Sequence, residues 1–278
     1  MKKLKVKHDK FLLAVLIILL ILSILGYAYI FYASYARDEF FQTSLKIANQ
    51  NQNSVFRVSR ILLYSSANAI DNSSNKSLQD LSICQYTDIA LSIDNTSYIS
   101  ELTTTNTVKE LYIDNIQITT NGGAGSQYLN YKNLNDFGKF DVLSVPENGR
   151  IDFNIIHNNE QNETADYSTP TFYADCSNPI SLGYVNRDIV QNFSVSEQVN
   201  SLSFNGKLLQ QANVNLDDIS YVINFDIHIK NYDDDNFTYH ATLNTNLNDS
   251  NGSLYSGYLY QGKTNTSGNE YDFFKELN

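Results

Sequence analysis

The chain of 278 residues contains no tryptophan, and only one long apolar run, close to the N-terminus. It has no G-x-S-x-G, H-E-x-x-H or C-x-x-C motif. It therefore lacks the nucleophile turn of α/β-hydrolases, the zinc-binding helix of zincin metalloproteases and the cysteine pair of thiol–disulfide oxidoreductases. The stretch "NGGAGSQ" lacks a following Lys-Ser/Thr, which excludes a phosphate loop. Twenty tyrosines could form a sugar-stacking platform, but without tryptophan they are better explained as strand residues. These absences leave no catalytic residue to name.

Basic side chains are also scarce: 19 Lys and Arg stand against 30 Asp and Glu. Without the first ten residues, 14 basic and 29 acidic side chains remain, a net charge of −15. Such a surface argues against nucleic acid or anionic lipid as the main partner, because neither would release counterions to it. The 35 asparagines are typical of an AT-rich genome and indicate a bacterial origin.

What the sequence does contain is a membrane anchor. Residues 1–10 form a cytoplasmic tail with five lysines, and residues 11–33 follow without a charge. A helix of 23 residues spans about 35 Å, enough to cross the hydrocarbon core. Because the lysines precede it, the positive-inside rule predicts a single-pass protein of the cell membrane with an extracellular C-terminal part.

A cleaved signal peptide is the alternative, because Ser34-Tyr35-Ala36 supplies small residues at the usual cleavage positions. The apolar run is much longer than the roughly 7–15 residues of a signal-peptide core. We therefore favour an uncleaved signal anchor.

Residues 34–71 are predicted to form a helical stem. No glycine or proline occurs between Gly26 and Gly122, and apolar residues recur at a seven-residue spacing. These residues are Phe41, Leu45, Ala48, Val55, Leu62 and Ala69. A helix packed on its own domain is favoured over a coiled-coil dimer.

From residue 72 onwards the hydrophobic period is two, which predicts strands. The candidate strands are Tyr86–Ile93, Val108–Ile118, Lys139–Val145, Ile151–Ile156, Val195–Phe204, Tyr221–Lys230, Phe237–Leu247 and Leu254–Gln261. Turn signals such as Asn205-Gly206 and Asn251-Gly252 separate them. The predicted fold class is mainly β, with residues 72–278 as one antiparallel β-sandwich or jelly-roll domain outside the membrane.

The stretch "HIKNYDDDNFTYH" at residues 228–240 is predicted to be the tip of a hairpin. With Asp234 at the centre of the turn, Ile229 faces Tyr239 and the apolar sides of both strands coincide. An EF-hand calcium loop is excluded, because Phe237 occupies its fifth position and no glycine follows.

The same register places His228 opposite His240, with Asp226 two residues along the same face. Two imidazoles and a carboxylate can share a transition metal, so these three residues are the candidate metal ligands. Polar residues on a solvent face are ordinary, and no other cofactor is expected.

Cys84 and Cys176 are the only cysteines, and both follow the anchor. A disulfide between them persists in an extracellular setting and would close a loop worth about 4–5 kcal/mol in the chain-entropy model. The alternative is two separate buried thiols.

Three function classes remain. We expect a non-enzymatic, membrane-anchored surface domain that binds a cell-wall component or a protein partner, with an extracytoplasmic hydrolase as the least supported alternative. The layout of apolar helix, stem and sheet also resembles that of minor pseudopilins, which implies a structural subunit of a surface or secretion assembly. That family has a glycine at its processing site and a glutamate five residues into the mature helix, and residues 9–15 supply neither. The oligomeric state is left open.

Overall fold

The computed structural model describes residues 2–50, 55–95, 103–122, 125–133, 149–157, 169–174, 179–195, 201–247, 260–264 and 271–276. The chain divides into two compact units, Met1–Gln52 and Asn53–Asn278. The predicted strand Lys139–Val145 and Cys176 lie outside the described residues.

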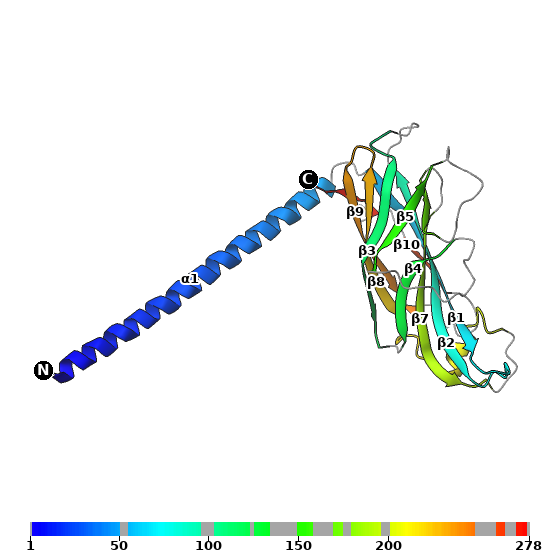
Figure 1. The fold of residues 1–278 in the computed structure, drawn as a ribbon, viewed down its shortest axis with the longest axis horizontal. Coiled ribbons are helices and arrows are strands. Elements are labelled where there is room, and N and C mark those ends of the chain that lie inside the picture. Colours follow the sequence, from blue (N-terminus) through cyan, green and yellow to red (C-terminus); the bar gives the residue numbers. More distant parts are fainter. Residues whose placement is uncertain are drawn as a thin grey trace. The chain divides into compact units, whose positions relative to one another are not determined.

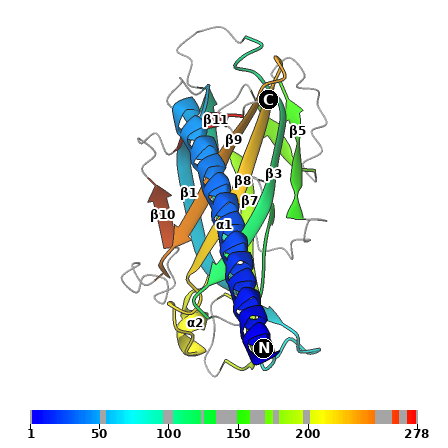
Figure 2. The same ribbon diagram turned by 90° about the vertical axis from the view of Figure 1, so that its left-hand side faces the viewer.

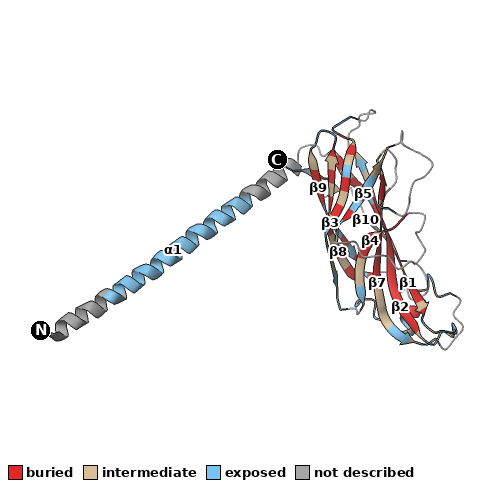
Figure 3. Cartoon of the chain, in the orientation of Figure 1, coloured by how far each residue is buried: buried red, intermediate tan, exposed pale blue. Residues whose placement is uncertain are grey.

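The first unit is one helix, α1 (Lys2–Gln50), labelled in Figure 1. Its segment Val15–Phe40, with a mean hydropathy of 2.5, is long and apolar enough to cross a membrane. Every side chain described along that segment is exposed, including Ile18, Leu22 and Phe31 (Figure 3). So much exposed apolar surface is typical of a helix that lies in lipid. By length and composition a signal sequence near the N-terminus passes the same test.

The second unit is mainly β, as predicted, and its strands form two sheets. A five-stranded sheet has the order β10-β1-β2-β7-β4, and a six-stranded sheet has the order β11-β9-β8-β3-β5-β6. All strand pairs are antiparallel except β5 with β6. The strands are β1 (Phe56–Asp71), β2 (Leu81–Asn95), β3 (Val108–Thr120), β4 (Ser126–Tyr131), β5 (Ile151–Ile156), β6 (Thr171–Tyr173), β7 (Ile180–Phe193), β8 (Tyr221–Asn231), β9 (Asn236–Thr245), β10 (Tyr260–Thr264) and β11 (Phe274–Lys275). Figure 2 shows β9, β8, β3 and β5 side by side.

The predicted helical stem is wrong over residues 56–71, which form β1. Phe56 and Val58 point into the core, a β-bulge follows before Arg60, and Ile61 and Leu63 then continue the buried side. The bulge inserts one extra residue and shifts the alternation from even to odd positions. The apolar residues of β1 therefore show no continuous period of two in the sequence, and their weak seven-residue repeat led to the prediction of a helix.

Several predicted strands are confirmed. Ile151–Ile156 matches β5, and Tyr86–Ile93, Val108–Ile118 and Tyr221–Lys230 fall within β2, β3 and β8. The prediction of a strand over Val195–Phe204 is wrong at its described C-terminal end, because residues 201–204 contain no strand and residues 202–204 form bends. Asn205-Gly206 is not a hairpin turn. It precedes the short helix α2 (Lys207–Gln211), whose Leu208 and Leu209 are buried.

Both sheets contribute to one apolar core. Phe56 of β1 meets Phe237 of β9 edge to face, with ring centroids 5.2 Å apart. Tyr184 of β7 packs on Tyr221 of β8 with centroids 3.9 Å apart. Fully burying one such side chain stabilises the fold by about 1.5–3 kcal/mol. A second, smaller cluster forms where Leu208 and Leu209 of α2 pack near β1 and β2.

The five-stranded sheet is buried on both faces along β2. One face of β2 supplies Ile89 and Leu91 to the core, whereas Asp88 points the other way and is still only 4% exposed. Lys132 Nζ lies 2.5 Å from Asp88 Oδ1, and the lysine side chain is 5% exposed. The lysine also lies over the ring of Tyr86, 5.3 Å from its centroid. This ion pair is therefore part of the interior.

Candidate functional site

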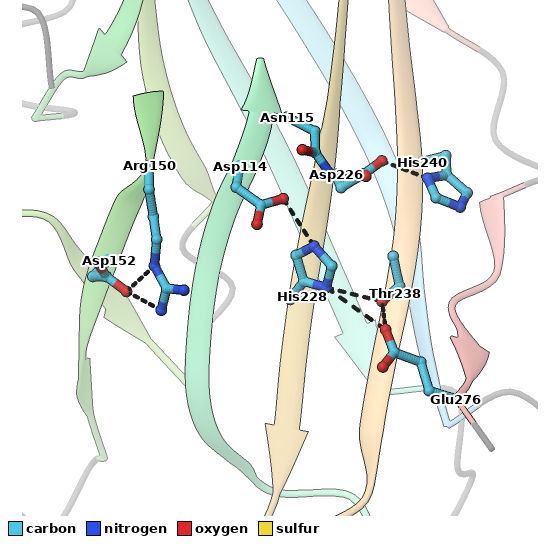
Figure 4. Close-up of polar contacts among 9 residues, drawn as sticks. All are labelled: Asp114, Asn115, Arg150, Asp152, Asp226, His228, Thr238, His240 and Glu276. Atoms are coloured by element: carbon cyan, nitrogen blue, oxygen red, sulfur yellow. Dashed lines mark hydrogen bonds and ion pairs between the residues drawn. The ribbon is translucent and has the colours of Figure 1, made fainter. Parts of the chain in front are cut away.

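The strands of the six-stranded sheet have one face in the core and one polar face, which we call the outer face. In β8, Ile223, Phe225, Ile227 and Ile229 are buried, and the residues between them are half-buried. Asp226 and His228 therefore belong to the outer face, as the period of two predicts. Figure 4 shows the polar side chains of this face on β5, β3, β8 and β9.

The hairpin predicted at residues 228–240 is confirmed. Asn231 closes its tip: its side-chain Oδ1 accepts hydrogen bonds from the backbone N–H groups of Asp233 (3.0 Å) and Asp235 (2.8 Å). Asp234 has φ +63°, a conformation that aspartate tolerates in turns. Lys109 Nζ and Lys230 Nζ lie 2.7 and 3.2 Å from Asp234 Oδ1, and both lower the pKa of that carboxyl.

The predicted register of this hairpin is wrong by two residues. His228 lies opposite Thr238 instead of His240, and His240 lies opposite Asp226. The cause is a loop centred on Asp233 in place of Asp234. A shift of two leaves every side chain on its predicted face, because the strand period is two, but it changes each cross-strand pair.

His240 therefore does not share a site with His228 as predicted, and binds Asp226 instead. His240 Nδ1 forms a short hydrogen bond with Asp226 Oδ1, and Asn115 Nδ2 donates to Asp226 Oδ2 at 2.8 Å. Asn115 reaches this position from a β-bulge in β3, where its φ is +51°. Partial burial raises the pKa of Asp226, but the hydrogen bonds from Asn115 and His240 outweigh it, and the net pKa is lowered.

His228 is held through both ring nitrogens. Its Nε2 lies 3.0 Å from Asp114 Oδ1, and its Nδ1 lies 2.9 Å from Thr238 Oγ1. The Thr238 hydroxyl donates its only proton to Glu276 Oε1, so His228 Nδ1 must donate to Thr238. The His228 ring therefore lies between the carboxylates of Asp114 and Glu276.

Tyr112 of β3 stacks with planar groups of His228 in β8 and of Arg150, the residue directly before β5. The His228 ring lies almost parallel to the Tyr112 ring, with centroids 4.5 Å apart and planes at 15°. The Arg150 guanidinium carbon lies 3.7 Å from the Tyr112 centroid and is fixed by hydrogen bonds of 2.8 and 2.6 Å to Asp152. Arginine and imidazole on an aromatic ring form favourable stacking contacts. Partial burial raises the pKa of Tyr112.

Among the described residues, one group has the spacing to hold a metal ion: Asp114, Asp226 and His228. One ligand atom of each lies within 4.8 Å of the others, and each side chain is half-buried. The two aspartates lie directly opposite each other on β3 and β8. The structure thus brings together two of the three predicted ligands, Asp226 and His228, and adds Asp114. His240 supports Asp226 from its other side.

Sequence reasoning missed Asp114. It lies in the predicted strand Val108–Ile118 at an outward position, so the strand alternation indicates its face. Its partner Asp226 is more than a hundred residues away along the chain, however, and the alternation of one strand does not reveal which strand lies beside it. Tyr112, Arg150 and Glu276 were missed for the same reason.

The predicted disulfide stays a prediction. Cys84 is buried in β2, and its Sγ accepts a hydrogen bond from the backbone N–H of Asp188 at 3.5 Å. Burial raises the pKa of this thiol. Cys176, its predicted partner, lies outside the described residues.

Comparison of the chain with protein-family models, curated proteins and solved structures finds no match to any of them. The account of function therefore depends on the chain's own residues.

Proposed function

We propose that the chain is a single-pass, membrane-anchored cell-surface protein. Its β unit is then an extracytoplasmic sandwich that binds a cell-wall component or a protein partner without catalysing a reaction. The observation that carries this proposal is the outer face of the six-stranded sheet, where polar side chains of four strands, β3, β5, β8 and β9, are held in fixed positions.

The anchor supports the membrane part of the proposal. Val15–Phe40 exposes apolar side chains along its whole length, and a helix of 26 residues is about 39 Å long, which exceeds the hydrocarbon thickness. The lysines that precede it favour a cytoplasmic N-terminus. That orientation puts the β unit on the outside.

The outer face supports the binding part. Asp114, Asp152, Asp226 and Glu276 supply four carboxylates, and Arg150 supplies one guanidinium (Figure 4). Most of these side chains are fixed by a partner on a neighbouring strand, so little conformational entropy is lost when a ligand binds. The excess of negative charge suits a partner with cationic or hydrogen-bond-donating groups.

A photo-crosslinking experiment on living cells tests this proposal. A photoreactive residue replaces Thr242, which is exposed on the outer face of β9, and in a second strain it replaces Asp94, which is exposed at the end of β2 in the other sheet. We expect crosslinks to a wall polymer or a surface protein from position 242 and none from position 94. Equal crosslinking at both positions, or none at either, would refute the outer face as the binding surface.

A divalent transition metal is the second candidate ligand, favoured by the spacing of Asp114, Asp226 and His228. Carboxylate oxygens with one imidazole nitrogen are ligands that such ions accept, and Asn115 and His240 would orient Asp226 around them. Protons compete with metal ions for imidazole and carboxylate ligands, so the affinity should fall on acidification.

Calorimetric titration of the metal-stripped full-length protein with Zn²⁺ tests this second candidate. We expect stoichiometric binding that His228→Gln weakens by about tenfold or more, the usual cost of losing a ligand or its support. His157→Gln is the matched control, because His157 lies at the end of β5 outside the group. The metal site is excluded if both variants bind like the wild type, or if the wild type does not bind.

A further inference from the structure

Thr238 differs from the other outward-facing residues of β9 because it is buried. It is 3% exposed, whereas His240, Thr242 and Asn244 on the same face are exposed. β11 pairs with β9 at this position. A hydrogen bond made by a buried hydroxyl is stronger than one that competes with bulk water, so Thr238 can hold its partners in fixed positions.

Glu276, one of these partners, directly follows β11, and two contacts fix the chain there. The backbone N–H of Glu276 donates a hydrogen bond to the carbonyl oxygen of Asn236 at 2.8 Å. Lys275 Nζ lies 2.6 Å from Asp235 Oδ2. The Glu276 carboxylate is thereby placed against the hydroxyl of Thr238, with which it forms a short hydrogen bond (Figure 4).

These contacts fix the position of one proton on the His228 ring. The Thr238 hydroxyl has a single proton, which it donates to Glu276 Oε1. Thr238 Oγ1 therefore accepts a hydrogen bond from His228 Nδ1 at 2.9 Å, and Nδ1 carries a proton. Nε2 is then the ring nitrogen that can coordinate a metal ion. It lies 3.0 Å from Asp114 Oδ1, on the side of the candidate metal group.

This arrangement is typical of metal-binding histidines. Such a histidine almost always donates its second N–H to a fixed acceptor, which sets the orientation of the ring and raises the basicity of the coordinating nitrogen. Thr238 is the acceptor here, and Glu276 accepts the proton of Thr238 in turn. Glu276 Oε1 also lies 3.8 Å from His228 Nδ1, so its negative charge acts on the ring directly.

We propose that Thr238 and Glu276 are positioning residues of the candidate metal group. They keep Nδ1 of His228 protonated and direct Nε2 towards the ion. The inference rests on the second candidate of the proposed function, the transition-metal site. It adds that the chain around β11 supplies none of the three ligands and still sets the metal affinity, through Thr238.

Long-range ¹H–¹⁵N NMR of the full-length protein in detergent, without metal and with Zn²⁺, tests the proposal. The chain contains four histidines, so the variant His228→Gln assigns the His228 signals. We expect Nδ1 to be protonated in both states of the wild type. We expect Zn²⁺ to shift the Nε2 signal more than the Nδ1 signal, because Nε2 is the coordinating nitrogen.

Substitutions on β9 separate a positioning role from a structural one. Thr238→Val keeps the shape of the side chain and removes the hydroxyl, so Zn²⁺ binding should weaken about tenfold, as when a histidine ligand loses its support. Thr238→Ser keeps the hydroxyl and should bind as the wild type does. Thr242→Val is the matched control, because the Thr242 hydroxyl donates to Asn224 at 2.9 Å on the same face and does not contact His228.

Glu276→Ala gives a second readout at an exposed side chain, where the substitution should leave the fold intact. Without Glu276 the Thr238 hydroxyl can donate to His228 Nδ1, so the ring proton should move towards Nε2 and the Zn²⁺ affinity should fall.

The proposal is overturned if Thr238→Val and Glu276→Ala bind Zn²⁺ as tightly as the wild type, or if the His228 nitrogen signals are the same in all variants. Either result leaves the metal group itself in place when the wild type binds Zn²⁺. A wild type that binds no Zn²⁺ removes the metal candidate and this proposal together, and leaves the surface-binding function untouched.

Discussion

The buried ion pair between Lys132 and Asp88 allows a quantitative prediction. The 2.5 Å contact joins two side chains that are 5% and 4% exposed, so neither charge is solvated by bulk water. Lys132→Met removes the ammonium group and leaves the Asp88 carboxylate buried beside Tyr86. Breaking a buried pair in this way costs about 3–5 kcal/mol, which is a large share of the 5–15 kcal/mol that stabilises a typical domain.

Urea unfolding of the full-length protein measures this loss of stability when it is monitored by the circular dichroism of the β-sheet. A slope of about 2–3 kcal/mol/M converts it into a midpoint lowered by about 1–2 M. The double variant Asp88→Leu/Lys132→Met removes both charges and should recover much of the difference. Lys109→Met is the control, because its 2.7 Å contact with Asp234 also joins a lysine to an aspartate but lies on the surface. Similar midpoints for Lys132→Met and Lys109→Met would refute the reasoning.

Three further predictions concern the topology, the site and the cysteines. Protease added to intact cells should digest the β unit, and full protection of the residues after Ala36 would overturn the orientation. The pKa of Asp226 is lowered in the fold, so its stabilising effect is complete above the unfolded value of about 3.9 and is lost as the pH falls through the lower folded value. The wild type should therefore unfold at higher urea than Asp226→Asn at pH 7, and the difference should shrink towards pH 3; a difference that stays constant would contradict the assignment. Thiol labelling of the unreduced, denatured protein should detect no free thiol if Cys84 and Cys176 form the predicted disulfide, and two free thiols would exclude it.

The sequence predicts which side of each strand is buried better than it predicts which strands pair with one another. In β8 the alternation from Ile223 to Ile229 identifies the buried side, and the structure agrees at each position. Strand β1 was missed because the bulge after Val58 breaks the alternation. Strand β7 was missed because its first half, from Ile180 to Val185, is buried on both faces and shows no alternation at all.

The candidate site likewise divides into residues that local sequence patterns identify and residues that depend on strand pairing. Asp226 and His228 were found because they lie two residues apart on the same face of one strand, β8, within reach of local reasoning. The hairpin register still came out two residues wrong, since alternation is unchanged by such a shift. Asp114 comes from β3 and Arg150 directly precedes β5, and their proximity depends on the order of strands in the sheet, which periodicity does not encode.

Co-sedimentation with isolated cell walls, with their attached proteins retained, tests the central claim most directly. Purified full-length protein, the double variant Asp114→Asn/Asp226→Asn and the control Asp94→Asn are compared under the same conditions, because the control also removes a carboxylate but from the other sheet. We predict that the wild type and Asp94→Asn sediment with the walls and that the double variant stays in the supernatant. If all three proteins sediment alike, or none sediments, the outer face of the six-stranded sheet is not the surface through which this protein binds.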